Sequence, residues 1–584
     1  MTSRPGVAAQ LVAAVIDAAP DRVRRRLDRS PNAAADWEWK EQPGGWKVET
    51  GGETVTLPKD CVDAIEQVQC TCLLSPNCFH VLACLSCLEV TVSETSDTQE
   101  VAQDQSAESE ATTAAETVQT SAKQQHAAAE LANSIAKLLQ VGIANAGVVL
   151  QSSLLRAVHH CRAEGLHRAA ASGLRVIAGI GQFRAKSVES EPGQLAEDVA
   201  DVLETTKQIA TLSEVANFWI GTARRKQFPV RPRKLYGLLA EPIITRSGFA
   251  GAAAYFVGED DQLYTASQVR PGDAQLARDA YRGGIEIGSI IQPARQLARS
   301  HYLGTDLTAS HDGRLGQGKS IKIVDQGPAA WQSERIQKRF QRPLPDQWNS
   351  VYSYAELPDD VRPAGWDFVF LTGAVVGALG PELLIKLADD ELTIRLAIQN
   401  ESEELLFRSN LRTLSQAPGL RLQIIGRMEL LNPLVVYPLA ITPLPIDDEQ
   451  APRLELPDSF AGRVFVGFDE IQRNHLINAA QTPMNLEETS AEQIDQADDP
   501  LAALRRRWIA ALLAGALTQR QTKTNTMAVE VAALQRSGFG TGAALLGSLG
   551  YEDAGNGPES FLATAVYLRA CRYELAKSRA MLPQ

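Results

Sequence analysis

The eleven residues from Cys70 to His80, CTCLLSPNCFH, place three thiols and one imidazole close together. Three cysteines and one histidine make a complete tetrahedral ligand set for zinc. Residues two apart on a flat strand point to opposite faces, so Cys-x-Cys and Cys-x-His must each lie on a tight turn for the side chains to converge. We expect one Zn²⁺ bound by Cys70, Cys72, Cys78 and His80. Such a site is closed and structural, because no position is left for a catalytic water.

The residues around this stretch predict the local fold. Ser75-Pro76-Asn77 supplies a bend between the two halves, and a helix over 81–88 begins at the second ligand pair. The positive end of a helix favours thiolates, which suits that position. Upstream, Trp37, Trp39, Trp46 and Val48 surround the turn sequence at 43–45, which predicts a β-hairpin. Apolar residues at helical spacing predict a single helix from Gly6 to Leu27.

The pattern C-x-C-x5-C-x-H, with a tryptophan-bearing hairpin before it and an apolar helix after it, resembles the SWIM-type zinc finger. The resemblance covers about residues 36–90 and fills all four ligand positions. It implies a β-β-α module that contacts DNA or protein. It also implies, as genomic context only, partners of the MoxR-type AAA ATPase and von Willebrand A-domain classes.

Other cysteines offer alternatives to this ligand set. The cluster can be a group of reduced core thiols, or Cys84 and Cys87 can compete as ligands, because with His80 they lie at i, i+4 and i+7 on one helical face. Buried thiols in the helix core are the preferred interpretation for this pair. Cys61 is a bystander. His159-His160-Cys161 cannot converge on one ion without partners from elsewhere in the chain, because adjacent helical residues point about 100° apart, so a packed or solvated helix segment is the preferred interpretation.

Outward from the motif, periodicity and composition divide the chain into segments of an α+β multidomain protein. Seven acids and no Lys or Arg between Thr91 and Ala122 predict a disordered linker. Alternating residues from Leu392 to Gln399 predict a half-buried strand. The expected segments are an N-terminal helix (1–35), the zinc finger (36–90), the acidic linker (91–123), a helical domain (124–232), an antiparallel β-rich domain (233–468) and a helical C-terminal domain (469–584).

Composition excludes several classes of protein. The 584 residues carry 70 Asp and Glu against 57 Lys and Arg, a net charge of −13, with 44% hydrophobic residues. This balance is globular, and it argues against a chain that coats nucleic acid over its whole surface. The basic cluster at 22–26 follows the first apolar stretch, the reverse of a signal peptide. No apolar run approaches the roughly 18–20 residues of a membrane helix, so we expect a cytoplasmic protein without membrane partners.

Residues 313–320, GRLGQGKS, fit the P-loop expression, and 464–470 resemble the apolar strand and acidic pair that hold Mg²⁺. A P-loop follows a buried strand and opens a helix. Here Thr305–Asp312 is polar, and Ile321–Val324 has the pattern of a strand. Without a helix N-terminus the loop has nothing to hold phosphate, so a nucleotide-using enzyme is the least favoured function.

We therefore expect a non-enzymatic scaffold whose zinc finger contacts a protein partner through Trp37, Trp39, Trp46 and Phe79, although these rings can equally belong to the core. Nucleic-acid binding through the same finger is the alternative. It would use a local basic face, made of Arg22, Arg24, Arg25, Arg26, Arg29, Lys40 and Lys47. The sequence identifies neither the partner nor the oligomeric state.

Overall fold

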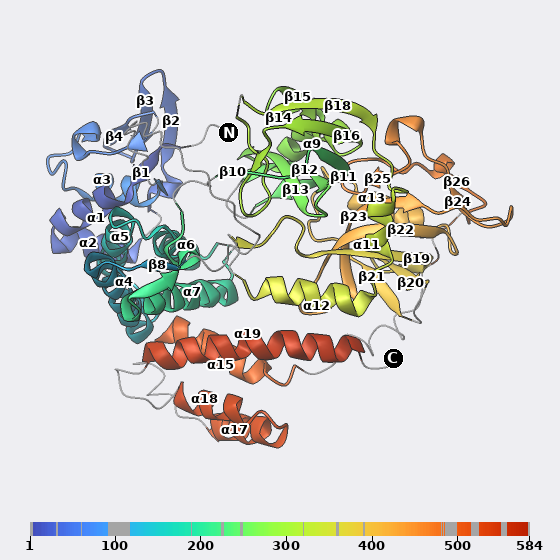
Figure 1. The fold of residues 1–584 in the computed structure, drawn as a ribbon. Helices are drawn as coiled ribbons and strands as arrows, with labels where there is room; N and C mark the ends of the chain where they lie inside the picture. Colours follow the sequence, from blue (N-terminus) through green and yellow to red (C-terminus); the bar gives the residue numbers. More distant parts are fainter. Residues whose placement is uncertain are drawn as a thin grey trace. The chain divides into compact units, whose positions relative to one another are not determined.

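Figure 1 shows the fold of the chain in a computed structural model. The structure describes residues 4–30, 33–59, 61–91, 117–187, 190–222, 227–245, 249–318, 320–357, 361–388, 392–480, 482, 484, 499–515, 525–549 and 557–581. The chain forms two compact units. The first consists of Met1–Arg224 and Asp498–Arg569, and the second of Arg225–Ala497 and Ala570–Gln584.

The first unit begins with a short strand and two helices. These are β1 (Gly6–Ala8), α1 (Ala9–Ala18) and α2 (Asp21–Arg29). The single helix expected over 6–27 is therefore wrong. Pro20 cannot donate a backbone hydrogen bond and disfavours helical geometry at Ala19, so the first helix ends there and Pro20 caps the second.

Two small sheets follow. One has the order β2-β3-β4-β6 and is antiparallel throughout. Its strands are β2 (Glu38–Gln42), β3 (Gly45–Glu49), β4 (Thr54–Leu57) and β6 (Gln69–Cys70). The expected tryptophan-bearing hairpin is β2–β3. In the other sheet, β1 pairs in parallel with β5 (Cys61–Val62) and β7 (Glu89–Thr91), a pairing that local periodicity does not reveal.

These strands and helices share one core with the helices that follow. Its buried members include Val48, Val55 and Leu82, together with Val148 and Leu155 of α5 (Val148–Ala163). The carboxylate of Asp28 accepts the backbone N–H of Val148 at 2.7 Å. The segments expected as separate pieces at 1–35, 36–90 and 124–232 are thus joined by a continuous core.

The helical part contains α4 (Ala122–Val141), α5, α6 (His167–Arg184), α7 (Pro192–Thr211) and the short α8 (Asn217–Ile220). Most of the expected acidic linker, 92–116, lies outside the described residues. The prediction of disorder is wrong for the end of this linker, because β8 (Thr117–Gln119) pairs with β9 (Glu214–Ala216) and Ser121 caps α4. Thr117 and Val118 have the β-branched side chains that strand pairing favours.

The C-terminal helices are α15 (Ala502–Ala514), α17 (Asn525–Arg536), α18 (Gly540–Ser548) and α19 (Gly557–Met581). Helix α15 packs on the helical part. Gly142 and Gly515, both with positive φ (82° and 77°), approach so closely that a Cβ on Gly142 would lie 2.4 Å from the carbonyl carbon of Ala514. Arg569 of α19 is paired with Glu197 and Glu204 of α7, at 2.7 and 3.0 Å.

The second unit contains a five-stranded antiparallel sheet of order β13-β12-β11-β16-β18. Its strands are β11 (Lys234–Ile244), β12 (Phe249–Gly258), β13 (Leu263–Pro271), β16 (Ser300–Thr305) and β18 (Lys322–Pro328). The hairpin expected around 258–261 is β12–β13. Around this sheet lie the pairs β10 (Phe228–Pro229) with β17 (Thr308–Ala309) and β14 (Gly284–Ile287) with β15 (Ile290–Pro293), and the helices α9 (Ala274–Arg282), α10 (Ala294–Leu297), α11 (Glu334–Phe340) and α12 (Leu344–Ala355).

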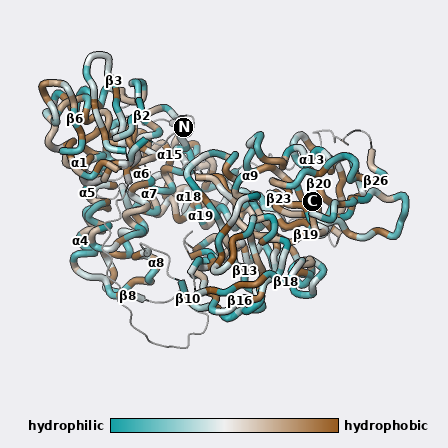
Figure 2. The backbone as a smooth tube through the Cα atoms, turned by 90° about the horizontal axis from the view of Figure 1, so that it is seen from above, coloured by the Kyte–Doolittle hydropathy of each residue, from teal (hydrophilic) through white to brown (hydrophobic). Residues whose placement is uncertain are grey.

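A second sheet has the order β21-β20-β19-β22-β23-β25, and β21 also pairs with β23, which closes five of these strands into a ring. The strands are β19 (Phe368–Leu379), β20 (Glu382–Leu387), β21 (Thr393–Leu396), β22 (Arg421–Met428), β23 (Val435–Pro443) and β25 (Val464–Phe465). Figure 2 shows that β19 and β23 are largely hydrophobic, as strands that face a core must be. Helix α13 (Phe407–Leu414) and the pair β24 (Arg453–Leu454) with β26 (Leu476–Ile477) complete this part.

The expected β-rich region is therefore present and mainly antiparallel, with β21–β23 as a parallel pair, but it does not end at residue 468. Residues 469–480 belong to the second unit, and they form no α-helix in the described part of the chain. In the described residues, no helix is long and apolar enough to cross a membrane.

Candidate metal centre

Cys70 and Cys72 are positioned by the edge of the four-stranded sheet. Cys70 ends β6 and pairs with Val55 of β4. The intervening residue, Thr71, forms backbone and side-chain bonds to the same strand. Its N–H donates to the carbonyl of Thr54 at 3.0 Å, and its hydroxyl accepts the N–H of Thr54 at 2.9 Å. The Thr71 hydroxyl also donates to the carboxylate of Glu53. The first ligand pair thus leaves the sheet in a fixed direction.

A tight turn begins at Cys72, as the ligand spacing requires. The N–H of Ser75 donates to the carbonyl of Cys72 at 3.2 Å, so Leu73 and Leu74 occupy the two central positions. Leu73 is fully exposed, and Leu74 keeps 53% of its surface exposed. The expected bend at 75–77 is present, and it leads into the second ligand pair.

Cys78 and His80 lie at the start of α3 (Phe79–Ser86). Cys78 is the N-cap residue, and its sulfur accepts the N–H of Val81 at 3.4 Å. This bond satisfies a backbone donor that a helix start otherwise leaves free. The expected helix at the second pair is confirmed, two residues earlier than its predicted start.

The four side chains converge. One ligand atom from each of Cys70, Cys72, Cys78 and His80 lies within 4.8 Å of every other, and Cys70 Sγ is 3.8 Å from His80 Nδ1. In a tetrahedral zinc site with Zn–S of about 2.3 Å and Zn–N of about 2.0 Å, neighbouring ligand atoms lie about 3.6–3.8 Å apart. The cluster can therefore hold a metal ion, and its donor set is compatible with zinc. Among the described residues it is the one such group of His, Cys, Asp and Glu.

The electrostatics of the four groups differ. Burial raises the pKa of the Cys78 thiol to about 12, and burial also raises the pKa of Cys70. The pKa of Cys72 is lowered: burial opposes ionisation there, but the N–H of Leu74 and the two neighbouring thiols outweigh it. Burial and the positive charge of Arg26 lower the pKa of His80, which favours the neutral imidazole that a metal requires.

Aromatic side chains pack around Phe79 and His80, next to the second ligand pair. The ring of Trp37 lies 6.2 Å from that of Phe79 and 6.0 Å from that of His80. The guanidinium of Arg26, on α2, stacks on the ring of Phe79, 4.0 Å from its centroid. Trp46 and Phe79 are each 7% exposed, and Trp37 and Trp39 pack partly buried against the core. Trp46 and Phe79 are therefore core residues, which is the alternative that the sequence left open for these rings, and Trp37 and Trp39 are half-buried.

The competing thiols lie outside the ligand cluster. Cys84 is fully buried in α3, and burial raises its pKa. Burial also raises the pKa of Cys87, at the C-cap of the same helix. Cys61 donates to Asp63 at 3.3 Å. As expected, none of them belongs to the cluster.

The side chains of His160 and Cys161, in the His159-His160-Cys161 stretch, do not converge on one point. His160 Nδ1 lies 2.5 Å from Glu130 Oε2, while Cys161 points into the core and donates to the carbonyl of Ala127. The three arginines at 505–507 form ion pairs with two acids: Arg505 with Asp499, and both Arg506 and Arg507 with Glu530.

The P-loop expression does not form a P-loop. Leu315 forms an isolated bridge with Ala309, and β18 follows at Lys322 where a helix would be required. Lys319 lies outside the described residues. Asp469, in the segment that resembles a Mg²⁺-binding strand, is 7% exposed and already bonded to Arg299 Nη2 at 2.7 Å and to the hydroxyl of Tyr281 at 2.6 Å.

No family model matches the sequence, and no curated protein matches it. A solved structure titled "Structural mimicry for functional antagonism" is similar over 34% of this chain and 85% of its own chain, with 13% sequence identity and a TM-score of 0.17. A TM-score this low supports no conclusion about fold or function.

Proposed function

We propose that residues 36–90 form a SWIM-type zinc-binding module and that the protein is a non-enzymatic scaffold that binds a protein partner through this module. The observation that carries the proposal is the turn between Cys72 and Cys78, which exposes Leu73 and Leu74 beside the ligand cluster. Burial of one leucine contributes about 1.5–3 kcal/mol to an interface. Two adjacent leucines on one turn can therefore contribute to the anchoring of a partner.

The turn is also suited to binding because it is preorganised. Thr71 is bonded to β4 before the turn, and Cys78 caps α3 after it. A metal held by the four ligands would fix both ends of the turn. A loop that is already ordered loses little conformational entropy when a partner binds, so more of the contact energy appears as affinity. The MoxR-type ATPase and von Willebrand A-domain partners implied by the resemblance belong to this proposal.

Nucleic-acid binding is the second candidate, and the arrangement of α2 favours it. The side chains of Arg22, Arg25 and Arg29 are exposed on the helix whose Arg26 stacks on Phe79. The rest of the expected basic face is weaker, because Lys40 and Lys47 are both paired with Glu49, at 3.3 and 3.1 Å. A few arginines neutralise only a few phosphates, which gives weak binding that falls steeply with salt.

The test compares two variants of the tagged full-length chain in native lysate. Leu73→Ser/Leu74→Ser should lose its stoichiometric protein partner, while Leu212→Ser, which changes a leucine that is 44% exposed elsewhere in the same unit, should retain it. Equal metal content of the two variants would show that the site is intact. A partner that persists on the double variant contradicts the scaffold proposal. Sub-micromolar binding of duplex DNA that survives about 150 mM salt would favour the second candidate.

A further inference from the structure

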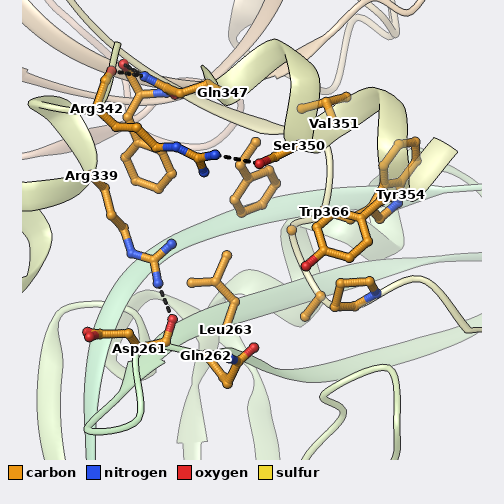
Figure 3. A pocket seen from close by; sticks show the side chains of 15 residues that line it. Asp261, Gln262, Leu263, Arg339, Arg342, Gln347, Ser350, Val351, Tyr354 and Trp366 are labelled. Carbon is orange, nitrogen blue, oxygen red and sulfur yellow. Dashed lines mark hydrogen bonds between the residues drawn. The ribbon is translucent and has the colours of Figure 1, made fainter. Parts of the chain in front are cut away.

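A pocket in the second unit combines positive charge with aromatic rings. It holds about 230 Å³ and lies among the β12–β13 turn, α11, α12 and the segment before β19 (Figure 3). No residue of the metal centre or of the P-loop expression lines it. The pocket is therefore a separate candidate site.

Two arginines from the α11–α12 region line the pocket (Figure 3). Arg339 donates to the backbone carbonyl of Asp261. Arg342 donates to the backbone carbonyl of Asp346 at 2.8 Å and to the hydroxyl of Ser350 at 2.5 Å. Within the described part of the chain, neither guanidinium forms an ion pair with a carboxylate. The positive charges of Arg339 and Arg342 are therefore not balanced by an ion pair within the described residues.

The one acid in the lining does not balance them, because the carboxylate of Asp261 is paired with Arg335. The pKa of Arg339 lies below its ordinary value. Burial is the main cause, Asp261 opposes it, and the charges of Arg335 and Arg342 lower the pKa further. The local charge is thus an excess of guanidinium, which favours an anion.

The other wall is apolar and aromatic. Tyr354 of α12 is 38% exposed, Trp366 is half-buried, and Phe368 and Phe370 also line the pocket. Arg339 lies 5.7 Å from the centroid of the Phe370 ring, so the cationic and aromatic parts of the lining adjoin. A flat ring can stack on this wall while an attached anionic group reaches the arginines.

We propose that this pocket binds a small aromatic phosphate, such as a nucleoside monophosphate, with the phosphate at Arg339 and Arg342 and the ring against Tyr354 and Trp366. A phosphate monoester carries a charge near −2, which matches two unpaired guanidinium groups better than a single carboxylate does. Guanidinium is also the side chain best suited to phosphate geometry.

The inference is tested by calorimetric titration of the full chain with adenosine monophosphate and with phenyl phosphate. Both should bind at one site per chain, and the affinity should fall with salt. Adenosine and inorganic phosphate, which each lack one half of the recognised chemistry, should bind at least about tenfold more weakly. Absence of saturable binding of both aromatic phosphates at millimolar concentration overturns the proposal.

Three single substitutions test whether the ligand binds in this pocket. Arg342→Gln changes an exposed side chain. It should weaken the binding of adenosine monophosphate at least about tenfold, since a charge-assisted hydrogen bond to the phosphate is lost. Tyr354→Leu should weaken the aromatic phosphates more than inorganic phosphate. Arg412→Gln, an exposed arginine on α13, is the matched control and should change nothing. Unchanged affinity in Arg342→Gln, or an equal loss in Arg412→Gln, contradicts the proposed location.

Discussion

The sulfur of Cys70 lies 3.8 Å from Nδ1 of His80, although ten positions separate the two residues along the chain. One residue ends a β-strand and the other lies in the first turn of a helix. Their approach is set by the backbone: β6 pairs with β4, and α3 packs in the core that those strands cover. The strand and the helix that carry the ligands are thus stabilised by strand pairing and by the shared core.

This arrangement predicts that removing the metal has a local effect. The finger shares its core with α1, α2 and α5, so chelation should not unfold all of residues 36–90. Hydrogen exchange of chelated protein should show lost protection at amides 71–81 and unchanged protection in β3 and α1. Loss of protection throughout 36–90 would show instead that metal and core fold as one unit, as in an isolated zinc finger.

Thr71 should act as a positioning residue for the metal. Thr71→Val removes the hydroxyl that accepts the N–H of Thr54 and donates to Glu53. Loss of a hydrogen bond of about 0.5–1.5 kcal/mol should weaken metal binding about 2–10-fold, and competition with a chromophoric chelator measures it. Thr56→Val, on the exposed face of β4, is the control. Equal affinities for the two variants would mean that Thr71 does not orient the ligands.

Asp469 should be structural. Its carboxylate accepts from Arg299 and Tyr281 and also from the N–H of Phe465 at 2.7 Å. Asp469→Ala leaves a buried guanidinium without its partner and should lower the free energy of unfolding by about 3–5 kcal/mol. Urea unfolding measures this, with the exposed Asp458→Asn as a control expected within about 0.5 kcal/mol of the unchanged protein. A stable Asp469→Ala protein would refute the structural role.

The stability of the first unit should depend on acid pH through Asp201. Burial raises the pKa of this carboxyl, but the charge of Arg168 and the hydroxyl of Ser172 outweigh it, so the pKa in the folded protein is lowered. Its stabilisation is therefore present above the unfolded pKa of about 3.9 and is lost as the pH falls through the lower folded value.

The Asp201→Asn variant should accordingly be less stable at neutral pH and lose less stability between about pH 4 and 2. Asp198 supplies the opposite case. Burial raises its pKa above the unfolded value of about 3.9, so its ionisation opposes folding, and Asp198→Asn should reduce the loss of stability as the pH rises from about 4 through the higher folded value. Identical pH profiles for the Asp201→Asn variant and the unchanged protein would contradict the assignment.

Local signals in the sequence predicted local features well. The ligand spacing, the turn sequence before Trp46 and the alternation around Ile394 each depend on neighbouring residues, and the structure has the corresponding cluster, hairpin and strand. Periodicity shows that a face is buried but not what covers it. The parallel pairing of β1 with β5 and β7, the packing of α15 against α7, and the pocket at Arg339 all join distant segments, and no local pattern marks them.

The role expected for the aromatic residues shows the same limit. Trp46 and Phe79 are of residue types that are common in contact surfaces. Only the fold shows that α3 and the sheet enclose them. The exposed side chains are the two leucines between the ligands, which in a sequence look like ordinary core residues.

The central claim is tested most directly by the zinc content of the purified full-length chain, measured by elemental mass spectrometry. We predict one zinc per chain, retained in Cys84→Ala/Cys87→Ala and lost in Cys72→Ser/Cys78→Ser, because only the second pair belongs to the ligand cluster. A chain purified without zinc, or full zinc content in Cys72→Ser/Cys78→Ser, would contradict the account.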